Sequence, residues 1–162
     1  DATIVSLTGN SDFAGAGPPP TLGTGWTISA GKAAHSAAAS ASINWTGLTL
    51  TAGKRYRFAV TIGSISGTGA NLTARLTGGT VVAGPAWTTT GRKIGSLVAV
   101  SGNTAFGFLA STNAVVQVDD APMFVETPAC APDGVWDYYA FPTNASGVEG
   151  PGATPILGVV IV

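Results

Sequence analysis

Strict alternation of apolar and polar side chains is the feature that most constrains what this chain can fold into. It is clearest in the stretch RYRFAVTI at residues 55–62, where Tyr56, Phe58, Val60 and Ile62 share one parity. Side chains on a β-strand alternate between its two faces. The pattern therefore predicts a strand with one face in a core and the other in solvent.

The same period recurs along the chain, separated by glycine-containing turns. Residues 48–51 alternate before the turn at 52–54, which predicts a hairpin with the strand that follows. Residues 72–77 alternate before the break at Gly78-Gly79. Further strands are predicted at residues 93–100, 104–110 and 115–125. This spacing of short strands is typical of an all-β sandwich.

The alanine-rich segment at residues 33–42 is the one place where helix propensity competes with this pattern. Alanine favours a helix, but the segment lacks the apolar stripe of an amphipathic helix and runs into Ile43-Asn44-Trp45. We predict that it is extended. His35, the only histidine of the chain, is expected at a surface or rim position among these small residues.

The charge composition bears on which partners the chain can bind. Charged residues make up 9% of the chain, against about 25% in an average protein, and the net charge is −1. Such a chain has no field that attracts phosphate backbones or anionic lipid, so we expect no nucleic-acid partner. The basic stretch at residues 54–57 is interpreted as the solvated face of a strand. No apolar run approaches the ~20 residues of a membrane span, so we expect no membrane insertion.

Residues 127–162 differ in character from the rest of the chain. They are rich in Pro and Gly, and they also contain a cluster of aromatic residues and an apolar end. Exposed aromatic side chains are common anchors of protein interfaces. We predict an extended tail that either wraps back on its own sandwich or docks on a neighbouring subunit. The interface candidates are Trp136, Tyr138, Tyr139, Phe141, Ile156 and Leu157.

Residues 1–126 carry a resemblance to a known family. The opening LTGNSDF at residues 7–13, the pair Gly25-Trp26, the hairpin-like LTLTAGKRYRFAVTI at 48–62 and the closing VDDAPM at 118–123 resemble the jelly-roll carbohydrate-binding modules, which have a galactose-binding-like fold. The resemblance implies an all-β, two-sheet antiparallel jelly-roll β-sandwich over residues 1–126, followed by the extended tail. Modules of this kind occur in glycan-degrading enzymes and in bacteriophage fibre, spike and head-decoration proteins, so the fold alone does not separate these functions.

The low charge, the many small residues and the aromatic tail look more like the bacteriophage version. The resemblance then implies a non-enzymatic structural protein of the virion, with other virion proteins or further copies of itself as partners. It also leaves open contact with a host polysaccharide. The alternative is a carbohydrate-binding module of a secreted, polysaccharide-active protein. The glycan-binding candidates are Trp26, Trp45 and Trp87, because aromatic rings stack on sugars. Each lies near a strand start or a turn without an evident shared face, so the alternative is that any of them belongs to the core.

Two adjacent acids in the closing stretch VQVDDAPMFV at residues 116–125 need an explanation. Alternation places Asp120 inward and Asp119 outward, unless a bulge at Ala121-Pro122 shifts the register. An inward carboxylate is costly unless it is paired or hydrogen-bonded. We therefore expect the inward acid to fasten the opening segment, either by accepting backbone N–H bonds or through calcium.

The calcium alternative comes from the family resemblance, in which a structural calcium often ties the opening segment to the last strand. Calcium takes about six to eight oxygen ligands, of which these side chains would supply only a part. The ligand candidates are Asn10, Asp12, Asp119 and Asp120. No other cofactor is expected.

No catalytic residue is predicted. A glycosidase needs two acids that face one substrate about 5–10 Å apart, whereas Asp119 and Asp120 are adjacent and face opposite ways. His35 has no nucleophile-elbow motif to pair with, and no glycine-rich stretch has the spacing of a phosphate loop. We therefore expect that the protein is not an enzyme.

Overall fold

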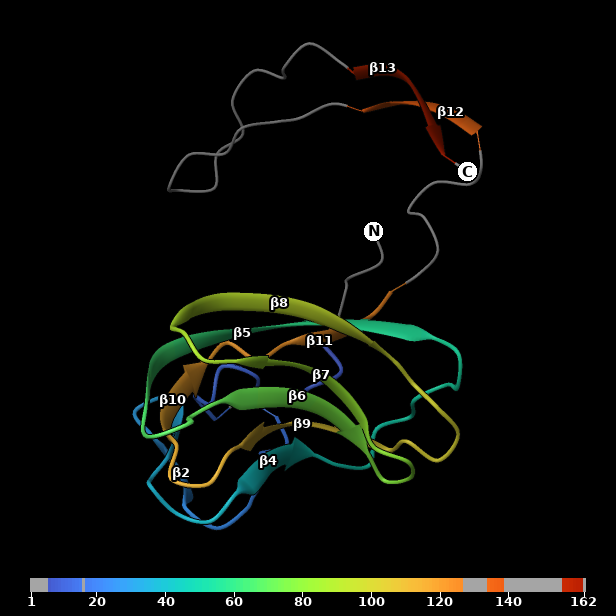
Figure 1. The fold of residues 1–162 in the computed structure, drawn as a ribbon. Helices are drawn as coiled ribbons and strands as arrows, with labels where there is room; N and C mark the ends of the chain where they lie inside the picture. Colours follow the sequence, from blue (N-terminus) through green and yellow to red (C-terminus); the bar gives the residue numbers. More distant parts are fainter. Residues whose placement is uncertain (1–5, 16, 127–133, 139–155, 162) are drawn as a thin grey trace. The chain divides into compact units, whose positions relative to one another are not determined.

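The computed structural model describes residues 6–15, 17–126, 134–138 and 156–161, the last two ranges by their backbone alone. By its contacts the chain divides into two units, Asp1–Glu126 and Thr127–Val162, which are described separately. The described part of the first unit has no helix and consists of two antiparallel sheets packed face to face (Figure 1). The predicted jelly-roll β-sandwich is confirmed.

One sheet has five strands in the order β1-β4-β9-β6-β7. Its strands are β1 (Thr21–Leu22), β4 (Ala41–Trp45), β6 (Leu72–Thr77), β7 (Val82–Trp87) and β9 (Ala105–Ala110). The central strand β9 contains Gly107, which lies opposite Asn44 on β4 and Arg75 on β6. A Cβ atom at this position would overlap the carbonyl oxygen of Ile43, so the close approach of β4 and β9 requires glycine here.

The other sheet has six strands. They are β2 (Trp26–Ser29), β3 (Lys32–His35), β5 (Arg55–Ser66), β8 (Gly91–Val98), β10 (Val115–Asp119) and β11 (Met123–Val125). The long strand β5 organises this sheet. One of its edges pairs with β8, and its other edge pairs first with β11 and then with β10, which continues to β3 and β2.

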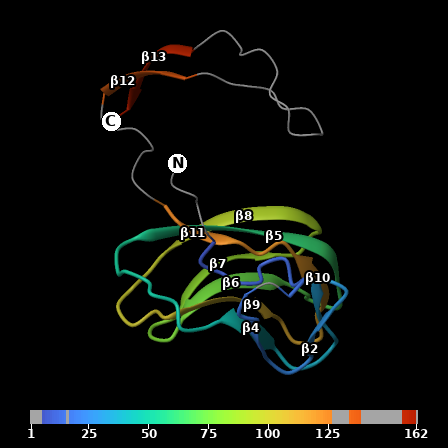
Figure 2. The ribbon, with the colours of Figure 1, turned by 180° about the vertical axis from the view of Figure 1, so that it is seen from behind.

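Several connections between consecutive strands cross from one sheet to the other, as a jelly roll requires. β3 and β5 belong to the six-stranded sheet, whereas β4 between them belongs to the five-stranded sheet, and the chain continues to cross in this way from β7 to β10. Figure 2 shows the sandwich from behind, where the opening segment runs beside β11. This crossing explains why the predicted hairpin of residues 48–51 with β5 is wrong. The segment is the connection between the sheets, and the amide of Leu48 bonds instead to the carbonyl of Thr104.

The core forms where the alternating patterns of the two sheets meet. Tyr56, Phe58, Val60 and Ile62 of β5 are all buried, as the parity of the sequence predicts. From the opposite sheet, β6 buries every second side chain. Phe58 lies with its ring centroid 5.1 Å from that of Phe106 on β9. Each such side chain contributes about 1.5–3 kcal/mol by leaving water, so this interlayer cluster holds the sheets together.

The remaining strand predictions fit in outline. The strands expected at 93–100 and 104–110 are β8 and β9, shifted by one or two residues. The alanine-rich segment is extended as predicted in β3 and at the start of β4, with residues 36–40 connecting the two. Strand β7 was not predicted, because Gly84 and Pro85 interrupt its pattern. Proline is tolerated there because β7 is an edge strand.

The second unit contains an antiparallel pair, β12 (Gly134–Tyr138) and β13 (Ile156–Ile161). Of the predicted interface residues, Trp136 and Tyr138 belong to β12, and Ile156 and Leu157 belong to β13. Tyr139 and Phe141 lie outside the described residues. Within the described residues, no helix has the length and apolar character to cross a membrane.

Candidate functional site

The closing stretch VQVDDAPMFV contains a β-bulge. From Asp119 to Met123 the chain advances by four residues, while their partners on β5, Thr61 and Phe58, are only three residues apart. The extra residue is accommodated at Asp120, whose φ of 47° lies in the left-handed region. Asp120 is therefore exposed and Ala121 takes the buried position. The prediction that Asp120 points inward is wrong, and the bulge is the physical reason.

The opening segment is fastened to this stretch, but by a hydroxyl group and the backbone rather than by a carboxylate. Thr8 is only 2% exposed, and its Oγ1 donates a hydrogen bond to the carbonyl of Ala121 at 2.9 Å. The same oxygen accepts the backbone N–H of Met123 at 3.1 Å. Two backbone bonds of 2.7 Å, from Leu7 to Met123 and from Ala121 to Ser11, complete the contact. In a chain rich in Ser and Thr, no sequence signal distinguishes Thr8.

The side chains predicted to bind calcium make local hydrogen bonds. Oδ1 of Asn10 accepts the N–H of Gly15 at 2.8 Å, and Oδ1 of Asp12 accepts the N–H of Ala14 at 3.1 Å. Asp119 accepts the N–H of Asp120 at 2.8 Å and forms a 3.1 Å ion pair with Lys32. Among the described residues, no three His, Cys, Asp or Glu side chains are grouped to hold a metal. The calcium site stays a prediction.

The tryptophans predicted to stack on sugars do not form an exposed platform. Trp26 is buried, and its indole N–H donates to the carbonyl of Ala41 at 2.9 Å. Trp45 is buried and stacks on Phe106, with 6.1 Å between ring centroids. Neither ring offers an exposed face to a sugar, because both are buried in the core, and glycan binding stays a prediction. Trp87 is half-buried and packs edge-on against Phe58 of the core.

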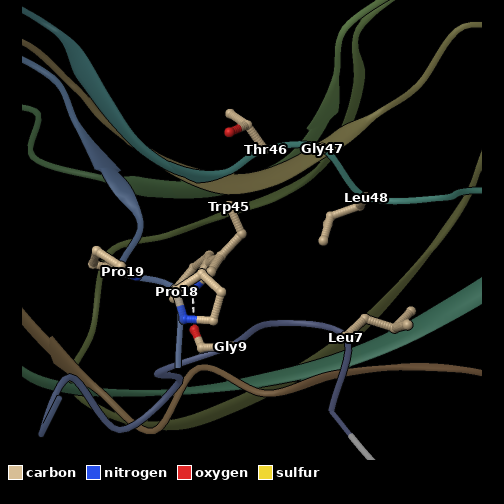
Figure 3. Close-up of a pocket in the computed structure, with 8 residues that line it drawn as sticks. All are labelled: Leu7, Gly9, Pro18, Pro19, Trp45, Thr46, Gly47 and Leu48. Carbon is tan, nitrogen blue, oxygen red and sulfur yellow. Dashed lines mark hydrogen bonds between the residues drawn. The ribbon is translucent and has the colours of Figure 1, made fainter. Parts of the chain in front are cut away.

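A pocket with a volume of about 270 Å³ lies beside Trp45 (Figure 3). Its lining residues are Leu7, Gly9, Pro18, Pro19, Trp45, Thr46, Gly47 and Leu48. The indole N–H of Trp45 already bonds to the carbonyl of Gly9, which leaves Thr46 as the polar side chain of the lining. Other polar contacts in this pocket would come from backbone groups of the lining.

His35 is buried in the core and not at the surface, which corrects the prediction for this residue. It shares the inward parity of Ala33 on β3, and it is 1% exposed. Its Nδ1 lies 2.7 Å from the carbonyl oxygen of Ala114, so Nδ1 carries the proton. Nε2 is buried without a hydrogen-bond partner among the described residues. A general base must reach the proton that it abstracts, and this ring is enclosed.

Arginine and apolar side chains lie together on the outer face of β5, β8 and β11. We call this surface the arginine face, and its residues are Arg55, Arg57, Arg92, Ile94, Val98 and Phe124. The strand register places Ile94 beside Ala59 and Phe124 beside Arg57. Ile94 is 69% exposed, the largest value among the exposed large hydrophobic residues of the described chain. The sequence indicated a solvated face here but not the apolar residues that β8 and β11 add to it.

The arginine face is positively charged. Glu126 pairs with Arg55 at 3.6 Å and with Arg57 at 3.4 Å, so one carboxylate serves two guanidinium groups. In the strand register, Thr61 of β5 lies between Arg92 on β8 and Asp119 on β10. The carboxylate of Asp119 forms its ion pair with Lys32. The face therefore combines exposed apolar side chains with cationic groups that are only partly neutralised.

The fold and these surfaces define an all-β jelly-roll module. Comparison with protein-family models and with curated proteins finds no match for this chain.

Proposed function

We propose that this chain is a non-enzymatic structural protein of a bacteriophage virion, as a head decoration, fibre or spike component. The observation that carries the proposal is the inward position of Trp26 and Trp45. Both rings serve the core, so the jelly roll acts as a scaffold rather than as a sugar-stacking platform. The exposed apolar side chains then serve contacts with other proteins.

The C-terminal unit is the second part of this proposal. Residues 127–162 hold Trp136, Tyr138, Tyr139 and Phe141, and aromatic residues supply much of the binding energy of protein interfaces. We infer that this segment docks on neighbouring subunits of the virion, either other virion proteins or further copies of the same chain. The protein would then be located in the particle.

The position of the protein in purified particles tests this proposal. Particles of the virus whose genome encodes the chain are banded on a density gradient and probed with an antibody against residues 1–126. We expect the protein to co-band with the particles, and immunogold labelling to place it on the head, fibre or spike. Detection only in the particle-free fraction, or a gene placed beside a glycoside hydrolase, would contradict the proposal.

The alternative, a secreted carbohydrate-binding module that contacts a polysaccharide, rests on the half-buried ring of Trp87. A glycan array separates the two functions. The virion proposal does not require that the protein bind any glycan on the array. The alternative requires that the wild type bind a glycan and that Trp87→Ala abolish this binding. Trp26 and Trp45 are unsuitable for this test, because their substitution would damage the core.

A further inference from the structure

The arginine face contains a hollow that fits one large apolar side chain. Its volume is about 170 Å³, and it is lined by Arg57, Phe58, Ala59, Arg92, Ile94, Pro122 and Phe124. A cavity of roughly 150 Å³ is large enough for a benzene ring. The hollow therefore has the size for one aromatic ring from a partner.

The groups around the hollow select for acidic neighbours of that ring. Arg57 has a side chain that is 66% exposed, and Glu126 is shared between it and Arg55. Guanidinium groups pair with carboxylates in bidentate geometry and also stack on aromatic rings. A segment that carries an aromatic side chain flanked by acids would satisfy both the hollow and the charge of the face.

The chain itself contains such a segment. All seven Lys and Arg residues lie within residues 1–126, whereas residues 127–162 contain three acids and no Lys or Arg. Two of these acids, Asp133 and Asp137, flank Trp136 in the stretch DGVWDYY. Residues 1–126 contain five acids beside the seven basic residues, so their charge is +2. Residues 127–162 carry a charge of −3, and the two values sum to the net charge of −1.

We propose that the arginine face of one molecule binds the acidic aromatic stretch around Trp136 of a second copy of this chain. This inference rests on the proposed function, in which residues 127–162 dock on neighbours, and it names both the receiving surface and the partner. Such a contact joins two different surfaces, so copies associate head to tail and form a ring or an open chain.

Sedimentation equilibrium of the full chain over a range of concentrations tests the proposal. We expect the wild type to exceed the monomer mass as concentration rises. The double substitution Arg57→Glu with Arg92→Glu should weaken association by about tenfold or more, because it places like charges opposite each other. Both side chains are exposed and the Arg57–Glu126 pair is a surface ion pair of small energy, so we expect the fold to be retained. The matched control is Lys54→Glu, an exposed cation on the turn before β5, which should associate like the wild type.

A charge swap makes the test specific for the partner. Asp137→Arg alone should weaken association, and its combination with Arg57→Glu should restore it. A wild type that stays monomeric, or a face reversal without effect, would overturn the inference. If Trp136→Ser disrupts particle association while the face reversal does not, docking through residues 127–162 stands, but the arginine face is not its receiver.

Discussion

The hydroxyl group of Thr8 joins the opening segment to the closing strand, and its removal gives the sharpest stability prediction. Thr8→Val preserves the shape of the side chain but removes the donor to the carbonyl of Ala121 and the acceptor for the N–H of Met123. Both groups are buried, and a buried polar group left without a partner costs about 1–3 kcal/mol. The N–H of Met123 keeps a second acceptor, Oγ of Ser6 at 3.2 Å.

The expected loss for Thr8→Val is therefore about 2 kcal/mol, which corresponds to a fall in Tm of roughly 4–8 °C for a chain of this size. Urea unfolding followed by tryptophan fluorescence measures it, because Trp26 and Trp45 are buried. Ser6→Ala alone should be mild. The double variant should lose more than the sum of the two single variants, since only then does the N–H of Met123 lose both acceptors.

Thr27→Val is the control, because it makes the same chemical change at an exposed position of β2. It should change the free energy of unfolding by no more than about 0.5 kcal/mol. A Thr8→Val variant as stable as this control would refute the view that the hydroxyl group fastens the opening segment.

Three further predictions follow from the bulge, the crowded sheet and the opening segment. Asp120→Gly should leave the free energy of unfolding unchanged or raise it by up to about 1 kcal/mol, because φ is positive at this position. Asp119→Ala should lower it by up to about 1 kcal/mol, because the ion pair with Lys32 is lost. The reverse order of the two variants in urea unfolding would contradict the bulge. Gly107→Ala should lose about 3 kcal/mol, the upper end of the usual cost of overpacking, because β4 lies close against β9. Gly84→Ala, with 3.6 Å to its nearest neighbours, should melt like the wild type. If calcium is bound near Asp12, a chelator should lower the Tm, and an unchanged melting curve would remove that prediction.

Much of the fold could be predicted from local pattern. The parity of β5 and β6 identified their buried side chains, because alternation is a property of the extended backbone itself. The boundary at residue 126 coincides with a change in composition and is also where the contacts divide the chain. The hairpin at residues 48–51 was wrong because local alternation does not reveal whether the next strand joins the same sheet or the opposite one.

The site residues were harder to predict, because burial depends on neighbours that are distant in sequence. The positions of Trp26 and Trp45 near strand starts or turns left open whether they bind sugar or belong to the core, and the register of β2 with β3 and of β4 with β9 directs both into the core. The alanines and serines around His35 in the sequence do not indicate that its ring packs against the ring of Trp26, with 5.3 Å between the ring centroids.

The sequence by itself determined that the chain forms alternating strands, that their inward faces build one core, and that positive charge is confined to residues 1–126. Only the tertiary structure decided that Ala121, and not Asp120, takes the buried position in VQVDDAPMFV, because one extra residue opposite β5 reverses the parity. It also decided that Ile94 and Phe124 join the arginines on one surface. That surface depends on the register of three strands far apart in the chain, and no local pattern encodes such a register.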